Sequence, residues 1–179
     1  MVLGSLLNNK TIRIKNSIYV IINYINMHLI NLLRIHQWSK NLLLFIPLIL
    51  SQNYDINFFI ETFIGFLSFS LIASSGYIVN DIIDYNFDKN DPERKKRLIA
   101  SGSISFYNAI IVFLILFVLS LLISFIYLDL NFIILSIIYL VTVILYSYFL
   151  KKIIIIDFII LTMFFVFRLI IGADITETS

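Results

Sequence analysis

Four polar side chains that suit a divalent cation stand close together near the middle of the chain. Asn80, Asp81, Asp84 and Asp88 follow a long apolar run, and the three aspartates are spaced i, i+3 and i+7. On a helix this spacing places the carboxylates on one face, where like charges repel one another unless a cation lies among them. Hard oxygen ligands suit Mg²⁺, which keeps some water and shares its other positions with substrate phosphates. The pattern predicts a magnesium site.

A run of cationic side chains follows the aspartates within a few residues. Arg94, Lys95, Lys96 and Arg97 are suited to the anionic oxygens of phosphates. Carboxylates for a metal, followed by cations for phosphate, together predict a diphosphate site at a membrane surface. A solvated loop between two membrane spans would also be charged, so this inference depends on the helical spacing of the acids.

The composition indicates which solvent surrounds the elements that carry these residues. Only 13% of the 179 residues are charged and 60% are hydrophobic, whereas a soluble domain is roughly a quarter charged. Apolar runs of about 20 residues, which as helices cross ~30 Å of hydrocarbon, predict spans near 33–50, 58–80, 105–128, 130–150 and 153–173. A membrane barrel would alternate polar and apolar residues in segments of about ten. We therefore expect an all-α integral membrane bundle.

Other patterns restrict the kinds of site and segment. The chain has no cysteine, which excludes disulfides and thiolate metal sites. Residues 1–32 lack the compact pattern of a signal peptide, and we expect them to form an interfacial or leading segment. His28 and His36 lack metal-ligand spacing and are interpreted as interfacial residues.

The distribution of Lys and Arg predicts how the spans cross the membrane. With five spans, one side collects the N-terminal cluster, Arg34, Lys40, the whole 81–104 loop and the Lys151-Lys152 pair. The connections on the other side, SQNYDIN and LDLN, contain no Lys or Arg. The positive-inside bias assigns the basic side, and with it the charged loop, to the cytoplasm.

Two ionisable residues fall inside the last predicted span. Charged groups at this depth are costly, about 2.5–3.5 kcal/mol each on insertion scales, so they usually face a polar cavity or one another. Asp157 and Arg168 lie on nearly the same helix face but about 16 Å apart along the axis. We expect Asp157 level with Asp81 and Asp84, and Arg168 paired with another group, either Glu61 or a helix outside this chain.

Several residues at the ends of spans have two interpretations. Gln37, Lys40 and Asn41 open the first span, and Tyr146 and Lys151 close the fourth. Aromatic and lysine side chains routinely anchor helices at the membrane interface. The same side chains could instead form the wall of the site.

The motifs together resemble those of the UbiA-type membrane prenyltransferase superfamily. Asn80-Asp81-x-x-Asp84-x-x-x-Asp88 is similar to the first aspartate-rich motif of that superfamily. RIHQWSKN, DPERKKRLIASG, YSYFLKKIIIID and FRLIIGA, in this order, resemble motifs of one branch, the decaprenyl-phosphate phosphoribosyltransferases. The resemblance extends over roughly residues 30 to 173.

The chain departs from the pattern of that branch at a few positions. Ile35 replaces a proline, Asp91 a histidine, Arg94 a lysine and Leu98 a proline. Asp91 removes a neutral or cationic ligand beside the expected phosphate site. Leu161 stands where many superfamily members carry a second aspartate, which argues against the quinone-type aromatic prenyltransferases.

The resemblance implies roles for these residues. It implies a bundle of about nine helices, of which this chain would supply about five as the N-terminal part of a transferase domain over 33–179. Mg²⁺ would be held by the motif from Asn80 to Asp88, with Asp84 and Asp157 as the catalytic pair. The residues expected to contact phosphate are Lys40, Asn41, Arg94, Lys96, Arg97, Tyr146 and Lys151. Two further residues, Gln37 and Arg168, are expected near the site.

The resemblance also implies substrates and partners. In the phosphoribosyl branch, soluble 5-phosphoribosyl diphosphate enters from the cytoplasm and a polyprenyl phosphate from the bilayer, with no nucleic acid involved. We expect a multi-pass protein of the cell membrane whose site faces the cytoplasm and whose bundle is completed by an oligomer or by a C-terminal half.

Other functions remain open. The same site could transfer a prenyl group from a prenyl diphosphate to an aromatic acceptor, as in quinone or haem O biosynthesis. A non-enzymatic cation-binding or scaffolding protein, or an inactive fragment, is a further alternative. The D-G-x-x-A-R opening of the CDP-alcohol phosphotransferases is absent from the sequence.

Overall fold

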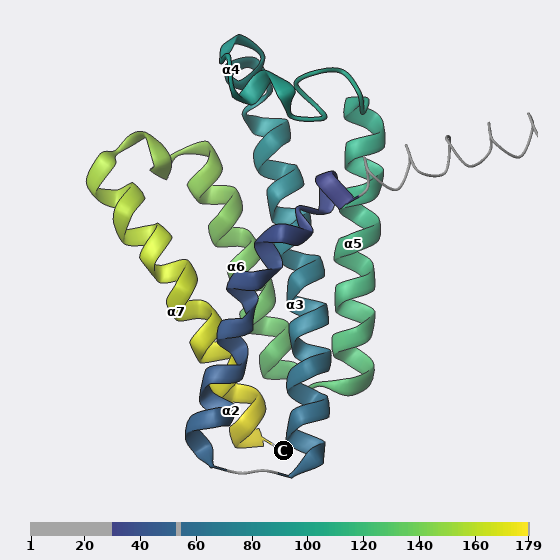
Figure 1. Cartoon of the computed structure of the whole chain (residues 1–179), viewed down its shortest axis with the longest axis vertical. Coiled ribbons are helices and arrows are strands. Elements are labelled where there is room, and N and C mark those ends of the chain that lie inside the picture. Colours follow the sequence, from purple (N-terminus) through teal and green to yellow (C-terminus); the bar gives the residue numbers. More distant parts are fainter. Residues whose placement is uncertain (1–29, 53–54, 179) are drawn as a thin grey trace, which may run out of the picture. The chain divides into compact units, whose positions relative to one another are not determined.

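The computed structural model describes residues 30–52 and 55–178, of which residues 33–178 belong to one compact unit. Most of the predicted leading segment lies outside the described residues. The described part is helical, which confirms the all-α prediction (Figure 1). Its elements, in chain order, are η1 (Ile35–Leu44), α2 (Phe45–Ser51), α3 (Ile56–Ile83), α4 (Tyr85–Asn90), η2 (Arg94–Lys96), α5 (Phe106–Tyr127), α6 (Leu130–Tyr148), η3 (Leu150–Lys152) and α7 (Ile154–Thr178).

Four helices of the described chain are long and apolar enough to cross a membrane. They are α3, α5, α6 and α7, and they match the last four predicted spans. Each exposes large apolar side chains, as expected where lipid rather than water surrounds a bundle. The chain is therefore a multi-pass membrane protein.

The first predicted span has a different form from the single α-helix expected over 33–50. A ten-residue 3₁₀ helix, η1, is followed by the seven-residue α2. Pro47 has no N–H to donate to the carbonyl of residue 43, so one α-helical bond across the junction cannot form. At about 2.0 Å per 3₁₀ residue and 1.5 Å per α residue, the two pieces rise together by about 30 Å. The segment thus covers a membrane-scale distance without being one α-helix.

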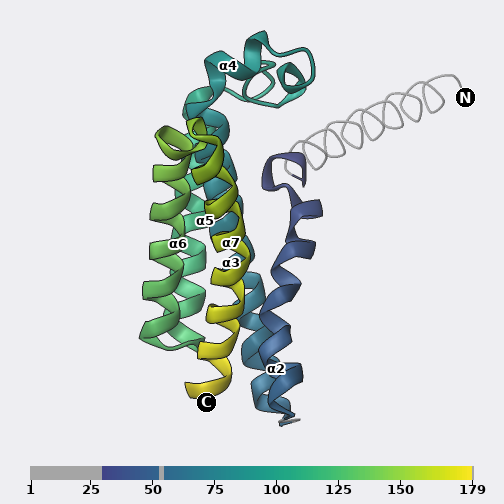
Figure 2. The same cartoon turned by 90° about the vertical axis from the view of Figure 1, so that its left-hand side faces the viewer.

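Helix α3 lies at the centre of the unit. It contacts η1, α5, α6 and α7 (Figures 1 and 2), and its buried positions include many small residues, among them Gly65, Ser70, Ala73 and Gly76. Small residues let helix backbones approach closely, which is the main source of packing energy where lipid supplies no hydrophobic drive. Figure 2 shows η1 and α2 running along the bundle beside α3 and α7.

A cluster of serine hydroxyls joins α3 to α5. Ser68 Oγ lies 3.0 Å from Ser120 Oγ and 2.7 Å from Ser124 Oγ, and Ser120 Oγ donates to the Ser68 carbonyl at 2.9 Å. All three side chains are buried. Hydroxyl bonds of this kind fix the register between membrane helices.

The charged connections gather at one end of the unit. The α4–η2 region and the α6–α7 turn lie at the same end, whereas the α2–α3 and α5–α6 connections lie at the other (Figure 1). The described Lys and Arg residues lie in or beside the first end, apart from Lys40 within η1 and Arg168 within α7. The predicted alternation of the connections is therefore present in the fold.

Replacing Ser68 with Ala is expected to lower the free energy of unfolding by about 1 kcal/mol, because the Ser120 and Ser124 hydroxyls lose a shared partner. Unfolding by SDS in mixed micelles measures the change. Ser103→Ala, in the exposed loop before α5, is the matched control. Equal effects of the two substitutions would contradict the assigned role of the α3–α5 serine cluster.

Candidate functional site

The acidic motif lies where α3 gives way to α4. Helix α3 ends at Ile83, Asp84 caps it, and α4 begins at Tyr85. The backbone N–H of Asp84 donates to the Asn80 carbonyl at 2.9 Å, and that of Asp88 donates to the Asp84 carbonyl at 2.8 Å. The chain therefore passes from α3 to α4 within the motif without losing these backbone hydrogen bonds. As a result, the carboxylates face different neighbours.

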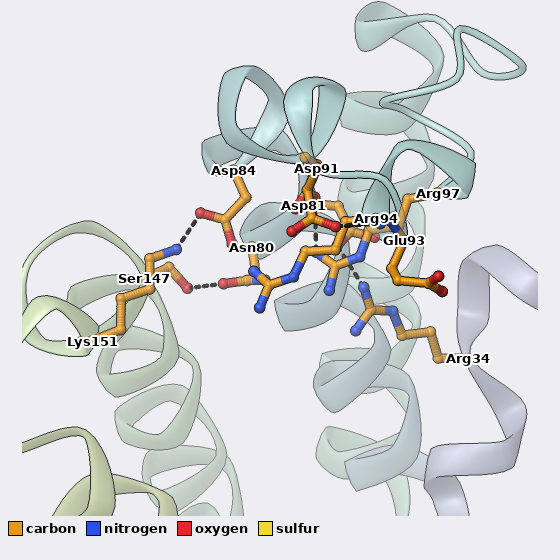
Figure 3. A network of polar contacts seen from close by, with 11 residues as sticks. Arg34, Asn80, Asp81, Asp84, Asp91, Glu93, Arg94, Arg97, Ser147 and Lys151 are labelled. Atoms are coloured by element: carbon orange, nitrogen blue, oxygen red, sulfur yellow. Dashed lines mark hydrogen bonds and ion pairs between the residues drawn. The ribbon is translucent and has the colours of Figure 1, made fainter. Parts of the chain in front are cut away.

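Asp81 and Asp88 share one guanidinium group. Arg97 Nη1 lies 3.1 Å from Asp81 Oδ1 and 2.7 Å from Asp88 Oδ2, and Arg34 Nη2 lies 2.5 Å from Asp81 Oδ1 (Figure 3). Asp88 is fully buried. The cluster brings η1, α3, α4 and the loop after η2 together, because buried carboxylates require cationic partners.

Asp84 and Asn80 instead face the end of α6. Lys151 Nζ forms an ion pair with Asp84 Oδ1, and Ser147 Oγ donates to Asn80 Oδ1 at 2.9 Å (Figure 3). The hydroxyl of Tyr146, near the end of α6, donates to Asp157 Oδ1 of α7 at 2.7 Å. Three helices are thus linked through groups of the predicted site.

The loop after α4 places Arg94 at the site. The backbone N–H groups of Arg94 and Glu93 each donate to Asp91 Oδ1 at 2.9 Å, which turns the chain into η2. These donors, that of Arg94 first, hold the pKa of the Asp91 carboxyl below its usual value. The Arg94 guanidinium lies 5.3 Å from the centre of the Phe87 ring. The aspartate that replaces the expected histidine therefore shapes a turn.

One cavity of about 650 Å³ collects most of the predicted site residues. The predicted residues in its wall are Lys40, Asn80, Asp84, Arg94, Arg97, Tyr146, Lys151, Asp157 and Arg168. Residues of the wall that the sequence analysis did not assign to the site include Arg34, Tyr77, Tyr139 and Ser147. Arg34 opens the RIHQWSKN motif and Ser147 lies within YSYFLKK. These motifs were the sequence signal that could have assigned both residues to the site.

Other predicted residues lie away from this cavity wall. Asp81 and Asp88 lie behind it in the Arg97 cluster, and Lys96 pairs with Glu93 on an exposed surface at 3.7 Å. Asn41 is buried and bonds Ser70 and Arg168, and the contact to phosphate expected of it stays a prediction. The side chain of Gln37 is not in the wall either.

Arg168 has partners that the sequence analysis did not predict. Its Nε donates to Asn41 Oδ1 at 2.8 Å, its Nη1 to the Phe164 carbonyl, and its Nη2 to the Tyr139 hydroxyl at 3.4 Å. The guanidinium also lies 5.6 Å from the ring centres of Phe69 and Tyr139. Neutral groups of the described chain surround the charge, and Glu61 is not among its partners.

The described residues contain no group of three or more acidic or histidine side chains placed together to hold a metal ion. The chemistry of the donors nevertheless suits Mg²⁺, because carboxylate and amide oxygens are its preferred ligands. Asp88 Oδ1 is also buried and has no hydrogen-bond partner in the described chain. The cationic side chains of Arg34, Arg97 and Lys151 now neutralise these carboxylates, so the predicted magnesium site stays a prediction.

Comparison with known proteins gives a family and two relatives. The model of the UbiA prenyltransferase family matches residues 42–179. Uncharacterized protein y4nM of Sinorhizobium fredii is 36% identical over 78% of this chain and 27% of its own length. Nodulation protein NoeC of Azorhizobium caulinodans is 32% identical over 40% of this chain and 24% of its own length. The chain thus spans about a quarter of the length of these relatives.

Replacing Arg97 with Met is expected to lower the free energy of unfolding by about 2–3 kcal/mol, because buried Asp88 would lose its cationic partner. The expected loss is below that for a fully buried pair, since 27% of the Arg97 side chain is exposed. Unfolding in mixed micelles without divalent cations measures the change.

Lys96→Met is the control for this substitution, because its ion pair is largely exposed and should contribute less than about 1 kcal/mol. An Arg97→Met variant as stable as Lys96→Met would contradict the assignment of Arg97 as the partner that stabilises Asp88.

Proposed function

Because the chain belongs to the UbiA prenyltransferase family, we propose that it acts as a Mg²⁺-dependent membrane transferase. The group transferred is phosphoribosyl, from 5-phosphoribosyl diphosphate to a polyprenyl phosphate. Members of the family are transferases, and the choice of substrates is the proposal. The charge and the lining residues of the cavity support it, together with the motif resemblance of residues 34–41 and 91–102.

The charge balance of the cavity wall carries the proposal. Seven cationic and two acidic side chains line the cavity, an excess of five positive charges. The cations come from η1, from the region after α4, from the α6–α7 turn and from α7: Arg34, Lys40, Arg94, Arg97, Lys151, Lys152 and Arg168. A wall of this kind favours a polyanion, and 5-phosphoribosyl diphosphate carries both a diphosphate and a phosphate.

Apolar residues of the same cavity suit a lipid. Ala73, Val143, Leu161, Phe164 and Phe165 line it with apolar surface. A cavity lined by both kinds of residue suits a polar donor beside the cations and the isoprenoid part of an acceptor beside the apolar side chains. A substrate that is soluble throughout would not need the apolar wall.

Mg²⁺ would be held by Asn80, Asp81, Asp84 and Asp88, whose oxygens are its preferred ligands. When bound, the ion supplies positive charge that neutralises the departing diphosphate. The side chains that now pair with these carboxylates would then be free for phosphate oxygens, and Arg97 and Lys151 already line the cavity. The same cations thus serve the site with and without ligand.

The reaction asks the chain mainly for positioning. The bond from ribose C1 to the diphosphate oxygen breaks, and the leaving diphosphate keeps the electron pair. A phosphate oxygen of the lipid forms the new bond to C1, so no protein nucleophile is required. Arg94, Arg97 and Lys151 would hold the phosphates, and fixed cations stabilise charge at the leaving group without reorganisation.

Asp84 and Asp157 approach the cavity from different helices. Asp84 lies at the α3–α4 junction, and Asp157, held by the Tyr146 hydroxyl, lies in the first turns of α7. A carboxylate on each side would favour the positive charge that develops at C1.

The proposed reaction is tested by product formation in lipid nanodiscs. We expect Mg²⁺-dependent transfer with 5-phosphoribosyl diphosphate and polyprenyl phosphate, and none with prenyl diphosphate and an aromatic acid. Asp84→Asn should reduce the rate at least about 100-fold, because a charged ligand at the reacting end is lost. Turnover with the second substrate pair would instead support prenyl transfer.

Asp129→Asn is the matched control, because this carboxylate lies at the start of α6, at the opposite end of the unit. It should leave the rate unchanged. An Asp84→Asn variant that retains full activity would refute the proposed role of the acidic motif.

We further propose that the charged end faces the cytoplasm of a cell membrane, since it holds the described basic residues other than Lys40 and Arg168. Because the chain has no native cysteine, single introduced cysteines report topology directly. Lys95→Cys should react with an impermeant maleimide only from the cytoplasmic side, and Asp129→Cys only from the other. The opposite pattern of labelling would reverse the orientation.

A further inference from the structure

The ten-residue 3₁₀ helix η1 is the least expected element of the fold, because 3₁₀ runs beyond three or four residues are uncommon. Side chains three residues apart eclipse one another on such a helix. Trp38, Asn41 and Leu44 therefore form one ridge along η1. Each of them contacts a neighbouring helix at a defined position.

On one side the ridge matches a row of serines on α3. Trp38 Nε1 donates to Ser74 Oγ at 3.0 Å, and Asn41 Nδ2 donates to Ser70 Oγ at 3.0 Å. Three residues of a 3₁₀ helix rise by about 6 Å, as do four residues of an α-helix. The two spacings coincide, so consecutive turns of η1 meet consecutive turns of α3.

On the other side the ridge matches α7 by the same spacing. Asn41 Oδ1 accepts from Arg168 Nε at 2.8 Å, and one turn further Leu44 lies against Gly172. A Cβ at position 172 would collide with the Leu44 backbone, which only a glycine avoids. Asn41 is thus bonded to both neighbours, and Ser70, Asn41 and Arg168 form a buried polar chain from α3 through η1 to α7.

The buried polar chain of Ser70, Asn41 and Arg168 lies next to residues of the cavity. Lys40 precedes Asn41 and lines the cavity, and Arg34, at the start of η1, also lines it and binds Asp81. Arg34 has a left-handed backbone (φ 50°), which the surrounding contacts must maintain. Both cations therefore depend on where η1 is held.

We propose that Arg168 is a positioning residue of the site: through Asn41 it holds η1 in register between α3 and α7, and so sets Lys40 and Arg34 at the cavity. The W-x-x-N and R-x-x-x-G patterns of the sequence are then the two halves of one clamp. A direct contact between Arg168 and the donor phosphates is a weaker interpretation, because only 3% of Arg168 is exposed and it lies about 16 Å deeper along α7 than Asp157.

The clamp can be observed without any reaction, because Trp38 is the only tryptophan of the chain and lies in η1. Arg168→Met should shift Trp38 emission to longer wavelength and increase its quenching by acrylamide. Arg168→Lys, which keeps a charged donor for Asn41, should restore most of the native signal. Ser120→Ala removes an equally buried polar contact outside the clamp and should leave the Trp38 signal unchanged.

Calorimetry of inorganic diphosphate binding in the presence of Mg²⁺ tests the positioning role. This measurement rests on the proposed function. Arg168→Met should weaken binding about tenfold. This is the effect expected if a cation displaced with η1 no longer donates one charge-assisted hydrogen bond to the diphosphate. Arg168→Lys should recover the affinity. A shifted Trp38 signal with unchanged affinity would reduce the clamp to a structural feature. Weaker affinity with an unchanged Trp38 signal would mean direct contact. Either result overturns the proposal.

Gly172→Ala provides a second variant in case Arg168→Met does not fold. It displaces Leu44 while every polar partner of the clamp stays in place, so it should also shift Trp38 and weaken diphosphate binding. If the unsubstituted chain binds no diphosphate, the proposed function fails, and the Trp38 measurements alone decide whether Arg168 holds η1. Native Trp38 emission in both variants would contradict the clamp.

Discussion

The pairing of carboxylates with cations at one end of a lipid-facing bundle is the constraint on which the rest of this structure depends. An unpaired charge at a helix end that is partly removed from water is costly, and each aspartate of the motif accordingly has a cationic partner. Those partners come from η1, from the loop after η2 and from the α6–α7 turn. Neutralising three side chains therefore brings distant segments of the chain to one place.

This pairing would also allow one set of groups to hold the bundle together and to bind the proposed ligand. Arg97 and Lys151 stabilise carboxylates while they line a cavity with excess positive charge. A divalent cation together with a polyanion could replace both sides of each pair, because the metal takes the carboxylates and the phosphates take the cations. The charges would then balance in the free and in the bound state.

The helical class, the last four of the five predicted spans and nine residues that line the cavity could be predicted from the sequence, because apolar length and the spacing of acidic residues are local signals. The sequence did not reveal the partners. The i, i+3, i+7 spacing of Asp81, Asp84 and Asp88 assumes one continuous helix, whereas the change of helix at Asp84 turns that residue toward Lys151. Asn41 and Arg168 were predicted as separate site residues, but they bond each other across 127 positions. Contacts of that range, and the 3₁₀ form of η1, depend on tertiary packing.

We propose that the cavity beside the α3–α4 junction binds a diphosphate together with a divalent cation. Calorimetric titration of the chain in nanodiscs with 5-phosphoribosyl diphosphate, with and without Mg²⁺, tests it most directly. We expect one donor molecule to bind per chain, strongly with Mg²⁺ and weakly after chelation. Absence of binding, or equal affinity with and without the metal, would contradict it.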